Sequence, residues 1–198
     1  MENKSSIQNS NKSSLLQKLL PVILTIVVIA VDQITKALVV KYIPRSDIAP
    51  FYGQDQENAV IPIFGDFLRL IHVRNPAVAF SLGSSFPLTL RKILFTAVPL
   101  VVIAMVFVIY FRNKDFTKFQ RWSICGILGG GLGNIIDRIF RPEGVVDFID
   151  MYFPIWFKTK RWPTFNAADS AVVVCGILFV ISFIVAVRGK KKKEPAGE

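Results

Sequence analysis

Four long apolar stretches dominate the pattern of hydrophobic and polar positions in this chain. They cover residues 19–40, 93–111, 122–140 and 167–187, and each is 19 to 22 residues long. A helix of that length spans about 30 Å, the thickness of the hydrocarbon core of a bilayer. The pattern therefore predicts an α-helical integral membrane protein with four transmembrane helices.

The two longest connections between these stretches carry a different pattern. Residues 41–90 are interrupted by prolines and glycines, and between these breakers residues 67–74 alternate between polar and apolar as a short strand does. Residues 141–165 mix aromatic and basic side chains, which suits the interface between membrane and water. We expect a small β-structure on the outer membrane surface, next to an interfacial loop.

The two ends of the chain are polar. Residues 1–18 show no apolar periodicity and predict a disordered tail, and residues 188–198 form a basic tail. The first apolar stretch is too long for a cleavable signal peptide and contains Asp32 and Lys36, so it predicts a retained helix. Basic residues directly follow the fourth stretch and also lie in the connection between the second and third stretches. By the positive-inside rule, both tails are expected in the cytoplasm, with a membrane domain at 19–187 between them.

Composition supports the membrane assignment and removes other classes. Hydrophobic residues make up 52% of the 198 residues and charged residues 19%, which excludes soluble enzymes. The formal net charge is +10, but the basic residues lie beside apolar spans, where lipid headgroups are the expected partner rather than nucleic acid. Cys125 and Cys175 lie inside predicted spans and are interpreted as small buried apolar residues, not as a disulfide or metal pair.

Ionisable and amide side chains inside the spans need a reason, because they are costly in lipid. Asp32 and Lys36 are four residues apart on one helix and can form an ion pair, either as a self-neutralising pair or in support of a site. The third stretch has five glycines, which allow close helix packing, followed by Asn134 and Asp137 on one face. Tight packing explains the glycines but not the paired Asn134 and Asp137.

Asp147 and Asp169 are the two candidates for chemistry. Asp169 lies in the first turn of the fourth span, and Asn166 lies three residues before it. A purely structural explanation is therefore also open, in which Asn166 caps the helix and Asp169 interacts with the positive end of the helix dipole. Asp147 stands alone in an apolar run, where burial would raise its pKa unless it is paired. If the two carboxyls meet, they share one proton, and such a pair can activate water and polarise a peptide carbonyl.

Three other intramembrane chemistries lack their residues, whereas a Ser–Lys dyad remains possible on composition, although no lone serine lies opposite a buried lysine at matching depth. A zinc protease of the HExxH kind needs two histidines, and the chain has one, His72, which is interpreted as a strand residue. No rhomboid-type serine motif and no GxGD motif is present. A small transporter or channel using Asp32, Asp137 and Asp169 remains an alternative, although there are no repeated, broken helices. A scaffold subunit packed through the glycine-rich helix is a third possibility, which leaves Asp147 unexplained.

Five short segments together resemble the lipoprotein signal peptidases, the type II signal peptidases of bacteria. The segments are 32–36 (DQITK), 75–81 (NPAVAFS), 133–138 (GNIIDR), 145–149 (VVDFI) and 165–169 (FNAAD). Each is weak alone, but together they follow the order of the family on four spans of suitable length. One departure is Ala77, where the family usually has glycine beside the asparagine.

The resemblance implies an aspartyl endopeptidase that removes the signal peptide from diacylglyceryl-modified prolipoproteins, just before the lipidated cysteine. It implies catalysis by Asp147 and Asp169 at the outer face of the bacterial cytoplasmic membrane, a β-cradle within 41–90 and a lid-like outer loop at 141–165. It also implies no cofactor and no metal, and we expect a monomer in contact with membrane lipids. The residues expected to bind substrate or shape the site are Asp32, Lys36, Asn75, Asn134, Asp137, Arg138, Asn166 and Ala168.

Overall fold

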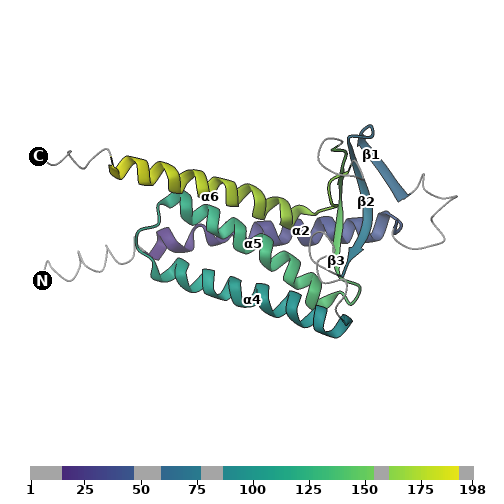
Figure 1. Ribbon diagram of the computed structural model, residues 1–198, viewed down its shortest axis with the longest axis horizontal. Helices are drawn as coiled ribbons and strands as arrows, with labels where there is room; N and C mark the ends of the chain where they lie inside the picture. The colour runs from purple at the N-terminus through teal and green to yellow at the C-terminus, as the bar shows by residue number, and fades with distance from the viewer. Residues whose placement is uncertain (1–14, 47–58, 77–86, 154–160, 192–198) are drawn as a thin grey trace, which may run out of the picture.

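The computed structural model describes residues 15–46, 59–76, 87–153 and 161–191. Four long helices run side by side, and a small sheet crosses one end of them (Figure 1). The helices are α2 (Val22–Tyr42), α4 (Leu88–Arg112), α5 (Lys118–Phe140) and α6 (Ala167–Lys191). Three helical segments are long and apolar enough to cross a membrane, namely Leu15–Tyr42, Ile93–Arg112 and Ala167–Arg188. The mainly helical membrane architecture is confirmed for these three.

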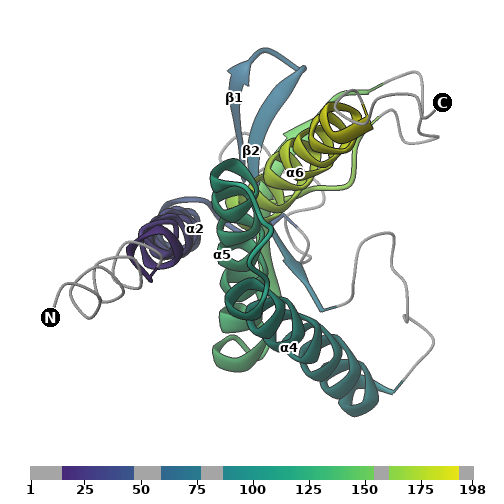
Figure 2. The ribbon, with the colours of Figure 1, turned by 90° about the vertical axis from the view of Figure 1, so that its left-hand side faces the viewer.

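The fourth long helix, α5, occupies the middle of the bundle. It contacts α2, α4 and α6, and the view along the helices places it between them (Figure 2). Twelve of its 23 residues are buried. It begins at a capping box, in which Thr117 accepts from the backbone N–H of Gln120 at 3.2 Å and Gln120 accepts from that of Thr117 at 3.0 Å. The residues of α5 are on average less apolar than those of its neighbours. This is consistent with its position, because the other helices cover much of α5.

The glycines of α5 allow these neighbours to approach closely, as expected from the sequence. A Cβ atom on Gly130 would lie 2.3 Å from the backbone oxygen of Ala168 in α6. A Cβ atom on Gly129 would lie 2.8 Å from the Cβ of Val28 in α2. Both distances are too short for real contacts, so larger residues would push α5 away from α6 and α2.

We expect Gly130→Ala to lower the melting temperature of the detergent-solubilised protein, because its new methyl group meets backbone that cannot rotate away. Overpacking of this kind costs about 1–3 kcal/mol. Gly176→Ala is the matched control, since a Cβ there meets nothing within 4 Å. Equal melting temperatures for the two variants, measured by thermal unfolding, would contradict tight packing at Gly130.

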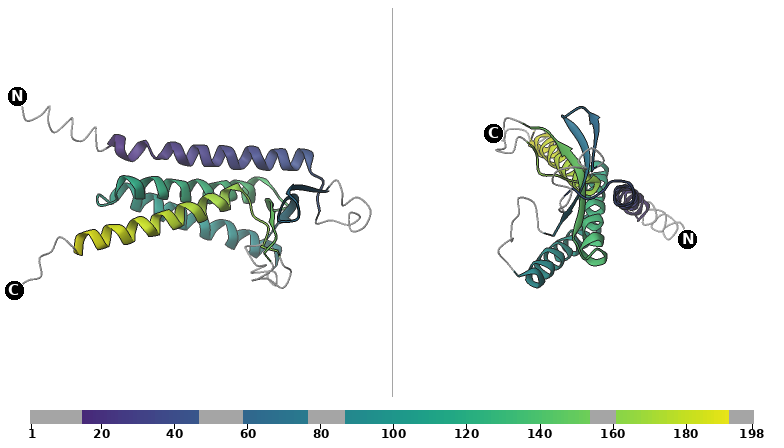
Figure 3. Two further views of the ribbon diagram at one scale, coloured as in Figure 1. Left: turned by 90° about the horizontal axis from the view of Figure 1, so that it is seen from above. Right: turned by 90° about the vertical axis from the view of Figure 1, so that its right-hand side faces the viewer.

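The sheet has three antiparallel strands in the order β1 (Val60–Phe64), β2 (Leu68–Asn75) and β3 (Val145–Met151). The predicted strand at 67–74 is confirmed as β2, and His72 lies on it with Nδ1 2.9 Å from the carbonyl oxygen of Ile43. The third strand comes from the 141–165 segment, so the sheet extends beyond the range 41–90 expected for the cradle. Figure 3 shows the sheet across the ends of the helices.

A small apolar cluster joins the sheet to α2. Val146 and Phe148 of β3 are buried against Val39 and Ile43 at the end of α2.

At the other end of the bundle, the residues before α2 bind the end of α4. Lys18 Nζ donates to the carbonyl oxygen of Phe111 at 2.8 Å. Residues 15–18 are helical, so the prediction of a disordered tail over 1–18 is wrong for them. Ala77 and residues 154–160 of the outer loop lie outside the described residues.

Candidate active site

Asp147 lies at the centre of β3, where the strand faces the ends of the helices. It is paired in register with Val73 of β2, and because side chains alternate along strands, Asp147 and Asn75 share one face of the sheet. Asn75 Nδ2 donates to one carboxylate oxygen of Asp147 at 2.9 Å. Asn166 Nδ2 donates to the other at 2.7 Å. The side chain is almost fully buried, with 3% of the residue exposed.

Asp169 lies in the first turn of α6 and is partly exposed. Asn134 Nδ2 of α5 donates to its Oδ1 at 2.7 Å, and the backbone N–H of Asn166 donates to its Oδ2 at 3.1 Å. In return, the backbone N–H of Asp169 donates to Asn166 Oδ1 at 2.9 Å. Asn166 therefore caps α6, as the capping interpretation expected, but Asp169 also faces the polar side chains of α5.

Asn166 joins the two carboxylates. Its side chain binds Asp147 and its backbone binds Asp169, and the residue is fully buried. Burial raises the pKa of Asp147 to about 7, although the hydrogen bond from Asn75 acts in the opposite direction. The negative charge of Asp169 raises it further. The arrangement is a pair of neighbouring carboxyls in which the pKa of Asp147 lies near neutral pH.

A buried ionic triad of Asp32, Lys36 and Asp137 lies directly behind this pair, with each side chain 0% exposed. Lys36 Nζ is 2.8 Å from Asp32 Oδ2 and 3.1 Å from Asp137 Oδ2. Its third hydrogen bond goes to Asn134 Oδ1 at 2.9 Å. All three N–H groups of the ammonium are thus used, which a buried charge requires. The predicted pair of Asp32 and Lys36 is present, and Asp137 completes it.

The triad holds the backbone next to both candidate catalytic residues. Asp137 Oδ2 accepts a hydrogen bond from the N–H of Val146 at 3.0 Å, and Val146 directly precedes Asp147. Asp32 Oδ1 accepts one from the N–H of Ala168 at 3.0 Å, and Ala168 directly precedes Asp169. The two carboxylates of one ionic triad therefore position the two segments that carry Asp147 and Asp169.

Comparison with known proteins connects this arrangement with a family. The sequence model of that family, described as signal peptidase (SPase) II, matches residues 24–185. The chain belongs to the signal peptidase II family. It is 47% identical to the lipoprotein signal peptidase of Treponema denticola over 176 residues, which covers 88% of this chain and 95% of that one. It is 39% identical to that of Treponema pallidum, covering 90% and 87% of the two chains.

Solved structures agree with this assignment. One of a bacterial membrane enzyme, 25% identical in sequence, matches with a TM-score of 0.69 over 88% of this chain and 93% of the other. A second, also of a bacterial membrane enzyme, matches with a TM-score of 0.65 at 23% identity and shares the fold.

Three residues of this signal peptidase II chain also contact the site but were not among its candidates. Gln33 Nε2 lies 3.1 Å from Asp32 Oδ2, from Asp137 Oδ1 and from the carbonyl oxygen of Gly133. Arg141 Nε lies 3.6 Å from Asp137 Oδ1. Gly144 has a φ of +105° and allows Asn75 to approach, since a Cβ atom there would lie 2.4 Å from the Asn75 oxygen. For Gln33, its place within DQITK was the available signal.

Arg138, a predicted site residue, has its guanidinium 6.0 Å from the centre of the Phe95 ring. It lies close enough to Asp147 and Asp169 to interact with both electrostatically. Within the described parts of the chain, no group of three His, Cys, Asp or Glu side chains is placed to hold a metal ion. Cys125 and Cys175 are both free thiols.

Proposed function

We propose that this chain is an aspartyl endopeptidase that removes the signal peptide from diacylglyceryl-modified prolipoproteins, just before the lipidated cysteine. Membership of the signal peptidase II family supports peptide hydrolysis and a prolipoprotein substrate. The observation that supports catalysis by aspartate is the joining of Asp147 and Asp169 through Asn166, together with the raised pKa of Asp147.

In the proposed mechanism, Asp169 is the general base and Asp147 the general acid. The Asp169 carboxylate takes a proton from water as the water oxygen bonds to the scissile carbonyl carbon. The protonated Asp147 donates a hydrogen bond to the carbonyl oxygen, which bears the developing negative charge. When the C–N bond breaks, the nitrogen of the lipidated cysteine receives a proton from the pair.

The remaining predicted residues are proposed as positioning groups. Asp32, Lys36 and Asp137 hold the segments that carry the dyad, and Asn134 orients Asp169. Asn75 and Asn166 orient Asp147, and Asn75, which is only partly buried, can also bind substrate backbone. The side chain of Ala168 packs against α5, where a Cβ atom on Gly133 would lie 3.3 Å from the Ala168 Cβ atom. Arg138 contributes positive charge beside both aspartates.

We further propose that α5 is a fourth membrane span, in addition to the three apolar ones. It has 23 residues, about 35 Å of helix, and lies among the others in the same direction (Figure 1). In this topology both termini are cytoplasmic, and the sheet and dyad lie at the outer face of the cytoplasmic membrane. The membrane domain at 19–187 would act as a monomer without cofactor, with lipid around it and a lid formed by the outer loop.

The pH dependence of the rate tests the role of Asp147. We expect kcat/KM to fall as the pH rises through about 7, because the free enzyme then loses the proton on Asp147. Asn75 stabilises the ionised form, so Asn75→Ala should raise this pKa and move the alkaline limb to higher pH, even at a lower rate. A limb that stays in place, or moves to lower pH, would contradict Asp147 as the acid.

The substrate proposal is tested with purified protein in detergent and one prolipoprotein prepared with and without the diacylglyceryl group. We expect cleavage of the lipidated form and little cleavage of the form with a free cysteine. Mass spectrometry of the products gives the cleaved bond, which should directly precede the modified cysteine. Equal cleavage of both forms would contradict recognition of the lipid, and no cleavage of either would contradict the peptidase function.

A further inference from the structure

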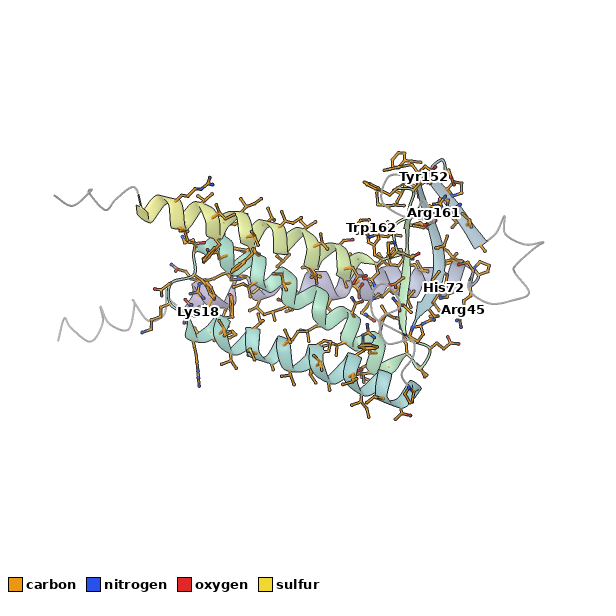
Figure 4. All side chains as sticks on the ribbon, in the orientation of Figure 1. Lys18, Arg45, His72, Tyr152, Arg161 and Trp162 are labelled. Atoms are coloured by element: carbon orange, nitrogen blue, oxygen red, sulfur yellow. The ribbon has the colours of Figure 1, made fainter. Side chains whose placement is uncertain are left out.

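A second charged cluster lies beside the sheet, at the end of the helices. We name it the arginine cluster, and its members are Arg45, Arg74, Arg141 and Glu143. Arg45 follows α2, Arg141 follows α5, and Arg74 is on β2, one residue before Asn75 and therefore on the other face. Figure 4 shows Arg45 beside His72 at the sheet end of the bundle. All four residues thus lie where the helices end.

The contacts in this cluster centre on Glu143. Arg45 Nη1 is 2.7 Å from Glu143 Oε1, and Arg74 Nε is 3.7 Å from Glu143 Oε2. Arg141 is two residues before Glu143 and also lies 3.4 Å from Gln33 Oε1 through Nη2. Its Nη1 atom is buried and, among the described residues, has no hydrogen-bond partner.

The cluster holds more positive than negative charge. Arg45 and Arg74 contact one carboxylate, that of Glu143, whose side chain is 57% exposed, while Arg141 lies 3.6 Å from Asp137 Oδ1. Burial lowers the pKa of Arg74, the negative charges of Glu143 and Asp137 oppose this, and the positive charges of Arg141 and Arg45 lower it further. An additional anion would further stabilise this largely buried guanidinium group.

The position of the cluster indicates which anion is available. It lies where α2 ends, and the outward side of α2 just below carries exposed Ile34 and Leu38, which are surfaces for acyl chains. At the same end Tyr42 is 64% exposed, with Lys41 over its ring at 4.9 Å, a combination typical of the headgroup region. A lipid beside α2 would place its phosphate at the level of the arginines.

We propose that the arginine cluster binds the phosphate of an anionic phospholipid, whose acyl chains lie along α2. Guanidinium groups bind phosphate oxygens through paired hydrogen bonds, and the Nη1 atom of Arg141 supplies a donor for one of them. Glu143 competes with the phosphate for Arg45 and Arg74. The site depends on the membrane placement of the bundle proposed above but not on catalysis, so it is tested by binding alone.

The experiment uses the full-length protein in an uncharged detergent, with binding measured by native mass spectrometry. The probes are dioctanoyl phosphatidylglycerol, dioctanoyl phosphatidylcholine and glycerol 3-phosphate. We expect the anionic lipid to bind at least about tenfold more tightly than the zwitterionic lipid, and Arg45→Gln to reduce that binding about tenfold. Glu143→Gln should bind the anionic lipid more tightly than the wild type, because the competing carboxylate is gone.

Lys41→Gln is the matched control, since it removes one positive charge from the same end of α2 but outside the cluster. The affinity of this variant for the anionic lipid should differ from that of the wild type by less than about twofold, because exposed charges act weakly. Equal losses for Lys41→Gln and Arg45→Gln would overturn the proposal in favour of diffuse attraction. Unchanged or weaker binding by Glu143→Gln would show that the cluster is only an internal ionic network. Equally tight binding of glycerol 3-phosphate would show that the ligand is a soluble phosphate ester instead.

Discussion

Asp147→Asn and Asp169→Asn are each expected to reduce cleavage of a lipidated prolipoprotein by about 10³-fold or more, without unfolding the protein. Asparagine preserves the shape and most hydrogen bonds of either side chain but cannot give or accept the proton that the reaction moves. The two losses should not add in the double variant, because the two carboxyls act as one unit. Initial rates of cleavage for purified variants provide the measurement.

Asp150→Asn is the matched control for these variants. Asp150 lies on the same strand as Asp147 and is equally buried, but its carboxylate binds Arg69 at 2.6 Å and Arg161 at 2.8 Å, away from the dyad. We expect Asp150→Asn to reduce the cleavage rate by less than about tenfold, because the variant loses only part of an ionic contact. If Asp150→Asn were as inactive as Asp147→Asn, or if either dyad variant kept most of its rate, the assignment would be wrong.

Lys36→Met is expected to produce the largest loss of stability, about 3–5 kcal/mol, together with loss of cleavage. The ammonium is the shared partner of Asp32 and Asp137, so its removal leaves two buried carboxylates facing each other. Their repulsion would weaken the two contacts that position Val146 and Ala168. Unfolding in detergent, followed by near-ultraviolet circular dichroism, measures the loss.

Two further variants test whether the loss of stability in Lys36→Met comes from repulsion between the buried carboxylates. Lys41→Met removes an exposed lysine from the same helix and should change stability by less than about 0.5 kcal/mol. Adding Asp137→Asn to Lys36→Met should restore part of the stability, because one unpaired charge is removed, but no activity. If the double variant were less stable than Lys36→Met, repulsion between the carboxylates would not be the cause.

Local pattern predicted the parts of this fold that depend on local physics. The helices follow from apolar runs, β2 from alternation, and the Asp32–Lys36 pair and the Asn166 cap from spacings of four and three residues. These features depend on contacts within one or two turns of a helix, or along one strand, and so leave a direct signature in the sequence. The assignment of a chemical role to Asp147 followed from its isolation in an apolar segment.

The features that could not be predicted depend on contacts between distant segments. The bond from Ala168 to Asp32 joins residues 136 positions apart, and β2 pairs with β3 across about 70 residues of chain. The backbone N–H groups involved are chemically the same in every residue, so no residue type marks them. The contacts of Gln33 are hard to predict for a related reason, since its amide finds partners on Gly133 and Asp137 only once α5 is packed against α2.

The low apolarity of α5 has a consequence for how the chain enters the membrane. In the proposed topology, the glycines and polar residues of α5 would be poorly solvated by lipid alone, so stable insertion requires α2 and α4 to be already present to receive it. The spans would then insert in order, because the first two provide the protein surface against which the third packs. A reporter fused directly after α5 is expected to lie at a single outer position when α2 and α4 precede it, and to give a mixed orientation when α2 and α4 are deleted.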